Sequence, residues 1–223
     1  MHTKYMLSCV CILFVFQLSC SKDALIPQYN GFADDYFQLR VGTTWVYQVD
    51  SVFRETGRPD KVKQYFEKHV IVDSLLDKHI LTYQIEVLRS DFVHKEFKNF
   101  RNFELRLTDS TVTYNGPKLK YLMLKNPMSM NQDWYNGHTG CYYNHSKVVD
   151  RQVERELGGD VYHDVLEIQH CSFYVFDQNH GHRGIYGRNV GLIQEYFYNG
   201  TYNRLANSST FNYTLRTLLT YAY

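Results

Sequence analysis

The sequence predicts an all-β domain of antiparallel strands, and three observations indicate this class. Apolar and polar residues alternate with a period of two along several segments, as in a strand with one buried and one wet face. Clusters rich in Gly, Pro, Asn and Asp, which favour turns, separate these segments. No long segment beyond the apolar N-terminus keeps a helical period. Together these features predict about nine to eleven strands in a single domain.

The first segment, residues 1–19, has the organisation of a cleaved export signal. Lys4 provides a short positive head, and an apolar run extends from Met6 to Leu18. This run is shorter than the ~20 residues that span a bilayer and has the length of a signal-peptide core. Ser19-Cys20 ends what resembles a lipid-attachment box, although Gln17 stands where an aliphatic residue is usual. We expect cleavage before Cys20 and acylation of its thiol, including palmitate; the alternative is an ordinary secretory signal.

Residues 20–29 are expected to form a tether and residues 30–223 the β domain. Trp45 and Trp134 are predicted to be core residues rather than ligand platforms. The sets predicted to share a buried face are, in chain order, Trp45, Tyr47 and Val49; Leu81, Tyr83, Ile85 and Val87; Phe103, Leu105 and Leu107; and Phe211, Tyr213, Leu215, Leu219 and Tyr221.

The charge of the chain is balanced, which narrows the classes of partner. The chain has 24 Lys and Arg against 23 Asp and Glu, and loss of residues 1–19 removes Lys4 alone, leaving 23 of each. A neutral chain without a basic run is poorly suited to nucleic acid or to an anionic membrane surface. We therefore expect no nucleic-acid partner, and contact with a membrane through the lipid anchor.

Cys141 and Cys171 are the cysteines left after Cys9 and Cys11 leave with the signal and Cys20 takes lipid. A pair in an oxidising compartment favours a disulfide. The bond would close a loop of ~30 residues and contribute roughly 3–4 kcal/mol in the loop-entropy model. Two buried free thiols, or Cys141 as a nucleophile, remain the alternatives.

Common catalytic signatures are missing from the sequence. It contains no Gly-x-Ser-x-Gly elbow, His-Glu-x-x-His, phosphate-binding glycine loop or dinucleotide fingerprint. Asp164 with Glu167, or Glu154 with Glu156, could form the carboxylate pair of a glycoside hydrolase. Charged residues on the wet face of strands produce such pairs by default. We expect a non-enzymatic protein without a cofactor.

His180-Gly181-His182 is one arrangement with the spacing of metal ligands. In an extended chain both imidazoles would point to one face, and His163 or His170 could join them. The competing interpretation, which we favour, is a polar and solvated loop over residues 177–183. Two histidines are fewer than the three or four protein ligands of zinc sites, so no metal is expected.

Three Asp-Ser pairs suggest sites of covalent modification. Ser51, Ser74 and Ser110 each follow an aspartate and resemble the O-glycosylation sites of proteins exported by Bacteroidota. Asp-Ser pairs are also ordinary turn residues. Modification of these three serines is therefore a hypothesis beside a structural role.

Several segments resemble an uncharacterised family of Bacteroidota envelope lipoproteins. Tyr36-Phe37-Gln38-Leu39-Arg40-Val41-Gly42-Thr43-Thr44-Trp45-Val46-Tyr47 is similar to the family's opening strand, which contains Trp-x-Tyr. The segment 126–137 resembles its Pro…Trp-x-Gly region, and residues 186–193 resemble the start of its Val-Gly-Leu-Ile strand. The segment 20–23 looks like the start of lipoproteins exported to the cell surface. The resemblance implies an antiparallel curved sheet or open barrel, and implies no activity.

These inferences predict a protein anchored by lipid to the outer membrane, with its periplasmic or surface orientation left open. The first hypothesis is a non-enzymatic protein whose β domain binds a protein, glycan or lipid partner. The second is a carrier of a hydrophobic ligand in an open barrel, which predicts an apolar cavity rather than a filled core. The third is an envelope hydrolase, which predicts convergent buried carboxylates with raised pKa values.

Replacing Cys20 by Ala is expected to move the protein from the membrane fraction to the soluble fraction, because the acyl chains would be lost. Cell fractionation followed by immunoblotting measures this change. Cys11→Ala, which alters a cysteine of the cleaved segment, serves as the control and should leave the distribution unchanged. Membrane association of C20A equal to that of the wild type would contradict the anchor.

Overall fold

The structure is a computed structural model that describes residues 36–222, apart from 38, 94, 139–143, 176 and 204 and the side chain of residue 175. Residues 31–223 form one compact unit. The predicted signal and tether lie outside the described residues, as does Cys20. Within the described part, no helix is long and apolar enough to cross a membrane.

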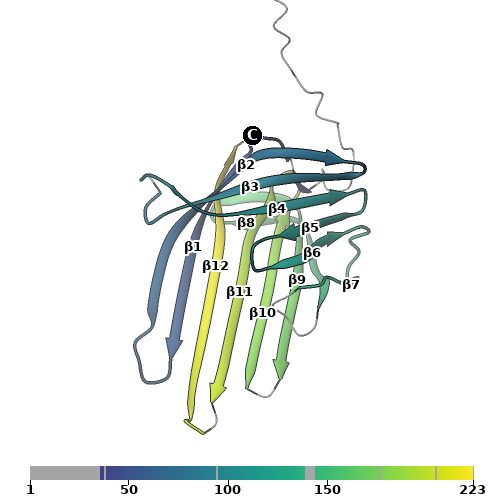
Figure 1. The fold of residues 1–223 in the computed structure, drawn as a ribbon. Coiled ribbons are helices and arrows are strands. Elements are labelled where there is room, and N and C mark those ends of the chain that lie inside the picture. Colours follow the sequence, from purple (N-terminus) through teal and green to yellow (C-terminus); the bar gives the residue numbers. More distant parts are fainter. Residues whose placement is uncertain are drawn as a thin grey trace, which may run out of the picture. The chain divides into compact units, whose positions relative to one another are not determined.

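Within the part of the chain that the structure describes, twelve antiparallel strands form one sheet, so the predicted all-β class is confirmed (Figure 1). The count exceeds the expected range because β5, β6 and β7 are too short to show a clear alternation in the sequence. The strands are β1 Thr44–Glu55, β2 Lys61–Asp77, β3 Ile80–Ser90, β4 Lys98–Thr108, β5 Thr111–Asn115, β6 Lys120–Lys125, β7 Asp133–Tyr135, β8 His145–Leu157, β9 Asp160–Val175, β10 Gln178–Gly187, β11 Gly191–Asn203 and β12 Ser208–Ala222.

The sheet is an up-and-down meander that curls into a nearly closed barrel. The strand order β6-β5-β4-β3-β2-β1-β12-β11-β10-β9-β8-β7 pairs the first strand with the last and leaves β6 and β7 as the edges. These edges meet, because the Leu122 N–H donates to the carbonyl of Asn136 at 2.7 Å. In Figure 1, β2 to β6 wrap across the upper part of the sheet, and β1 and β9 to β12 extend below it.

Irregularities in the strand pairing help the sheet to curve. Register shifts interrupt seven of the strand pairs in the described sheet. A bulge inserts one residue into one strand of a pair, which bends that strand and increases the local twist. Strands longer than ten residues can therefore follow the wall of a barrel and still keep their hydrogen bonds.

The predicted inward face is confirmed for three strands. Side chains that alternate along β1, β3 and β4 are buried at the positions expected from the sequence, namely Trp45, Tyr47, Val49, Leu81, Tyr83, Ile85, Val87, Phe103, Leu105 and Leu107. Their apolar parity is continuous, so the interior of the barrel is largely hydrophobic along this wall.

The predicted inward face of β12 is wrong. Leu218 is buried, whereas Leu219 and Tyr221 are 41% and 39% exposed. Thr220 pairs with Val46 and Leu218 pairs with Tyr47, so Leu219 is the extra residue of a bulge. Before this bulge, Arg216 pairs with buried Val49 and therefore faces the interior. A shift of one residue exchanges the two faces of a strand, which the sequence pattern did not reveal.

Trp45 and Trp134 are both buried, as predicted. The indole N–H of Trp45 donates to the carbonyl of Val190 at 2.8 Å, which ties β1 to the turn before β11. The indole N–H of Trp134 donates to the carbonyl of Leu122 at 3.2 Å, across the junction of β6 and β7. Each tryptophan therefore combines apolar burial with a satisfied donor.

Trp134→Ala is expected to lower the free energy of unfolding by about 3–5 kcal/mol, because it removes a large buried ring at the junction of the sheet edges. Urea denaturation followed by circular dichroism measures the change. Tyr135→Ala is the matched control, since the neighbouring Tyr135 is 65% exposed. A loss for W134A no larger than that for Y135A would show that the junction does not depend on this ring.

Candidate functional site

The interior of the barrel contains a cavity of about 290 Å³. Ligand pockets in proteins commonly measure ~300–1,000 Å³, so this space suits a small ligand. Aromatic rings dominate its lining: Phe37, Trp45, Tyr47, Phe103, Tyr114, Tyr121 and Phe197. Aliphatic lining comes from Ile85, Leu105, Leu119, Met123 and Leu192, and polar lining from His69, Arg101, His182, Glu195, Thr214 and Arg216.

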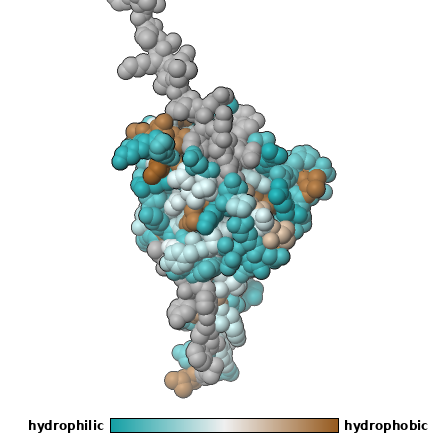
Figure 2. All heavy atoms as spheres, turned by 90° about the vertical axis from the view of Figure 1, so that its right-hand side faces the viewer, coloured by the Kyte–Doolittle hydropathy of each residue, from teal (hydrophilic) through white to brown (hydrophobic). Residues whose placement is uncertain are grey.

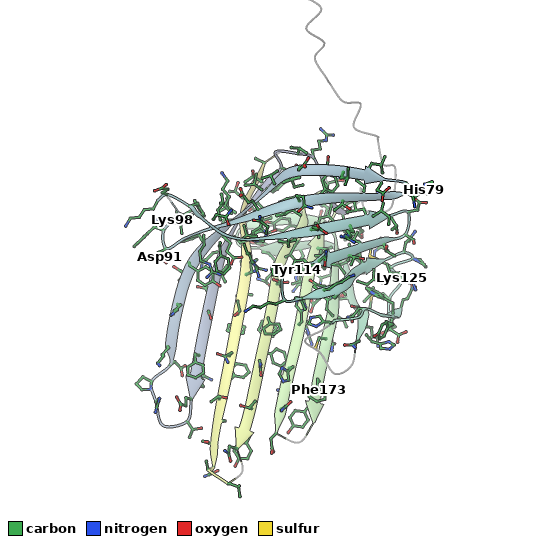
Figure 3. All side chains as sticks on the ribbon, in the orientation of Figure 1. His79, Asp91, Lys98, Tyr114, Lys125 and Phe173 are labelled. Atoms are coloured by element: carbon green, nitrogen blue, oxygen red, sulfur yellow. The ribbon has the colours of Figure 1, made fainter. Side chains whose placement is uncertain are left out.

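The cavity has an apolar end and a polar end. Trp45 lies at the apolar end, near Val190 and the turn between β10 and β11. Arg216 lies farther along the sheet, because it pairs with Val49, four positions beyond Trp45 on β1. Solvent reaches the polar end, where Phe197 is 37% exposed. Figure 3 shows the lining residue Tyr114 near the middle of the view, on β5, one of the wrapped strands.

A buried carboxylate organises the polar end. Glu67 on β2 is 1% exposed, and three arginines from three other strands surround it. Its oxygens lie 2.8 Å from Nη2 of Arg89, 3.0 Å from Nη2 of Arg216 and 3.8 Å from Nη2 of Arg101. His69 contributes a further contact of 3.2 Å through Nε2. Burial alone would raise the pKa of Glu67, but Arg216 and the hydrogen bonds from His69 and Arg89 hold that pKa far below its ordinary value.

A second carboxylate extends this cluster around the barrel. Arg216 also forms an ion pair with Glu195 on β11. The other oxygen of Glu195 lies 2.9 Å from Nε2 of His182 on β10. Arg216 therefore bridges the two carboxylates and joins residues of β2, β10 and β11 through β12.

Three histidine rings surround Tyr121 beside the cavity. His138 Nε2 lies 3.2 Å from His182 Nδ1, and the rings of His170 and His182 are 4.9 Å apart. The ring of Tyr121 lies 5.1–5.3 Å from all three. His170 Nε2 lies 2.8 Å from the hydroxyl of Tyr186. The residues come from β6, β9, β10 and the segment after β7, so tertiary folding assembles this group.

Burial keeps these imidazoles neutral at pH 7. It lowers the pKa of His182 to about 3, with a further contribution from Arg216. Burial, followed by the charge of His182, lowers the pKa of His138 to about 4. The pKa of His170 is held well below its ordinary value by burial and by the other two rings. Burial also lowers the pKa of His69 to about 4, against the opposing effect of Glu67.

The carboxylate pairs considered for hydrolysis have other partners. Asp164 lies 3.0 Å from Arg151, and Glu167 lies 2.9 Å from Arg155. Glu154 and Glu156 are exposed on β8. A general acid would need a raised carboxyl pKa, whereas the pKa of Glu67, which is buried beside the cavity lining, is lowered.

The predicted loop over residues 177–183 is wrong. Residues 178–187 form β10, and His182 faces the barrel interior. His180 is half-buried with its ring 5.9 Å from that of Phe173, whereas His170 lies beside His182. His163 is exposed and pairs with Glu154. Among the described residues, no group of three or more His, Cys, Asp or Glu could hold a metal ion. The expectation that the protein binds no zinc stays a prediction.

Other candidate residues from the sequence lie away from the cavity lining. Cys171 is buried on β9, and Cys141 lies outside the described residues, so their disulfide stays a prediction. Ser51 and Ser74 are half-buried on β1 and β2, and Ser110 is exposed in the turn between β4 and β5. Their glycosylation also stays a prediction.

Sequence reasoning missed Glu67, Arg101, Glu195 and Arg216, because charged residues in alternating segments were assigned to the wet face. The sequence nevertheless contained one indication that two of these residues face inward. Glu67 has the same strand parity as Ile71, which is buried, and Arg101 has the same parity as the predicted core residues of β4. A charge at an inward position of a strand indicates a buried partner of opposite sign.

Lowering the pH from 7 to 5 is expected to reduce the free energy of unfolding. Histidines of the unfolded chain, with pKa near ~6.5, take up protons in this range. The folded pKa values of His69, His138 and His182 are lower, at about 4, 4 and 3. Protons therefore favour the unfolded state, by on the order of 1–2 kcal/mol per histidine at pH 5.

Urea unfolding at both pH values measures this dependence. In His182→Gln, which removes a group facing Glu195, Arg216 and His138, the loss between pH 7 and 5 should be smaller than in the wild type. His79→Gln, at an exposed position, is the control and should keep the wild-type loss. Equal stability of the wild type at the two pH values would contradict the assignment of neutral buried histidines.

Similar solved structures assign no function to this chain. No protein-family model and no curated protein matches it. A protein of Bacteroides fragilis, described as inferred to be exported and as having a YmcC-like fold, aligns with a TM-score of 0.48 and 8% identity over 85% of this chain and 100% of its own. An inferred lipoprotein of Parabacteroides distasonis aligns with a TM-score of 0.40 and 9% identity over 82% of this chain and 97% of its own.

Proposed function

We propose that this protein is a lipid-anchored protein of the cell envelope whose barrel binds a small, largely apolar ligand without acting as an enzyme. The cavity of about 290 Å³ inside the sheet carries this proposal. A filled interior would favour a protein that acts through its outer surface. An aromatic-lined space with one end open to solvent instead supports the carrier hypothesis.

The rings of the cavity wall are held in place without a ligand. The hydroxyl of Tyr47 donates to the carbonyl of Leu192 at 3.1 Å, and the indole of Trp45 is bonded to Val190. A preformed wall loses little conformational freedom on binding, so burial of apolar ligand surface is not offset by ordering of the protein.

The face of the molecule seen in Figure 2 is less suited to an apolar ligand than the cavity is. Figure 2 shows a face that is mainly hydrophilic or intermediate, with hydrophobic residues in small separate groups. Single exposed apolar residues are normal on protein surfaces and indicate no binding site. The difference between this face and the aromatic lining of the cavity supports binding inside the barrel.

The envelope location is supported by the first 23 residues. Lys4, the apolar run to Leu18 and Ser19-Cys20 favour export and acylation. We propose anchoring at the outer membrane and membership of the Bacteroidota lipoprotein family that the segments 36–47, 126–137 and 186–193 resemble. A carrier fixed to a membrane would receive or deliver its ligand at that surface.

Thr214→Phe is expected to weaken binding of N-phenyl-1-naphthylamine, an uncharged dye that fluoresces in apolar surroundings, by about tenfold or more. Thr214 lines the cavity, so a larger side chain there fills it. A fluorescence titration of residues 20–223, produced without lipid, measures the affinity. Thr217→Phe is the matched control, because it lies three positions along β12 on the opposite face. Equal binding by wild type and T214F, or no binding by the wild type, would contradict the proposal.

A further inference from the structure

The polar end of the cavity has one more positive than negative charge. Arg101, Arg216 and Glu195 line the cavity, and Glu67 and Arg89 adjoin them without lining it, so the described cluster holds three arginines against two carboxylates. The neighbouring His69 and His182 are neutral at pH 7, since burial holds their pKa values at about 4 and about 3. Charges removed from water are stable when they are paired, so this cluster has room for one more anion.

From this cluster we propose that the ligand of the barrel carries a single carboxylate, which binds between Arg101 and Arg216 while its apolar body extends toward Trp45. This inference rests on the proposed function and names the chemical class of the ligand. The ligand is thus a monoanionic amphiphile.

The pairing of the arginines is uneven. Arg89 and Arg216 each lie within hydrogen-bond distance of Glu67. Arg101 approaches the same carboxylate at 3.8 Å, beyond hydrogen-bond distance. The Nε–H groups of all three arginines are buried and have no hydrogen-bond partner among the described residues. Buried donors are normally satisfied, so these three show that hydrogen bonding in the cluster is incomplete. The part of the cluster that a ligand can reach is the Arg101 side chain, which is 34% exposed.

The positions of Arg101 and Arg216 suit one shared anion. Both side chains line the cavity, from β4 and β12 respectively. Their Nη2 atoms lie 3.8 and 3.0 Å from the same Oε2 atom of Glu67, so the two guanidinium groups converge. A planar guanidinium matches a carboxylate with two parallel hydrogen bonds. A carboxylate entering the cavity can therefore bind Arg101 through paired hydrogen bonds and lie near Arg216, whose Nη1 and Nη2 also contact Glu195 and Glu67.

The direction of the ligand follows from the two ends of the cavity. The Arg101 side chain is 34% exposed, which places the head group at the open end. The opposite end consists of apolar groups around Trp45 and Phe37, which suit a hydrocarbon or aromatic body. A phosphate monoester carries ~−1.5 to −2 at pH 7 and would exceed the single positive charge available. The charge therefore favours a carboxylate over a phosphate.

Isothermal titration calorimetry at pH 7.5 of residues 20–223, produced without lipid, tests this inference with three probes of equal chain length. Decanoate is expected to bind at least tenfold more tightly than methyl decanoate, which lacks the charge, and more tightly than decyl phosphate. In Arg101→Met, which keeps an apolar stem, the preference for decanoate over the ester should fall below about threefold. Arg106→Met is the matched control, since Arg106 is exposed on the opposite face of β4 and should keep the full preference.

The outcomes separate the two proposals. Equal affinity for decanoate and its methyl ester, or tighter binding of decyl phosphate, would overturn the proposal that the ligand carries a carboxylate. Binding of the neutral dye would in that case still support the proposed apolar site. A preference for decanoate that R101M retains would also overturn it, because the anion would then bind elsewhere. Absence of binding by all three probes and by the dye would overturn both proposals.

Discussion

The polar part of this barrel's interior is built on the ion pairs between the buried carboxylate of Glu67 and the arginines around it. Transfer of an ion from water into a protein costs several kcal/mol unless counter-charges replace its hydration. Arg89, Arg101 and Arg216 supply those charges from β3, β4 and β12, on both sides of β2 in the sheet. Arg101 and Arg216 also line the cavity, so its wall is polar at that end.

Arg216 extends this network of polar contacts to other strands of the barrel. It pairs with Glu195, which contacts His182, which in turn contacts His138. Each link satisfies a polar group that burial would otherwise leave without a partner. These contacts fix the positions of the Glu195 and His182 side chains in the wall. A ligand in the cavity would thus meet a rigid wall on which charge, hydrogen-bond donors and aromatic rings have defined places.

The architecture explains how a chain of alternating strands encloses a cavity. The first and last strands pair, so the sheet lacks an open edge at that point, and the true edges, β6 and β7, meet through Leu122 and Asn136. Register shifts bend the long strands along the wall. Closure of the sheet removes exposed edges and surrounds an interior of limited width. Inward aromatic rings fill part of that width, and the remaining space forms the cavity.

The all-β class and the inward positions of β1, β3 and β4 could be predicted from local alternation, because a period of two depends on neighbouring residues alone. The inward position of Arg216, the strand over residues 178–187 and the existence of the cavity depend on contacts between distant segments. Glu67 and Arg216 are 149 positions apart, and a single bulge at Leu219 sets which face of β12 is buried. Charge pairing across such a separation depends on the pairing and register of whole strands, which local alternation does not specify.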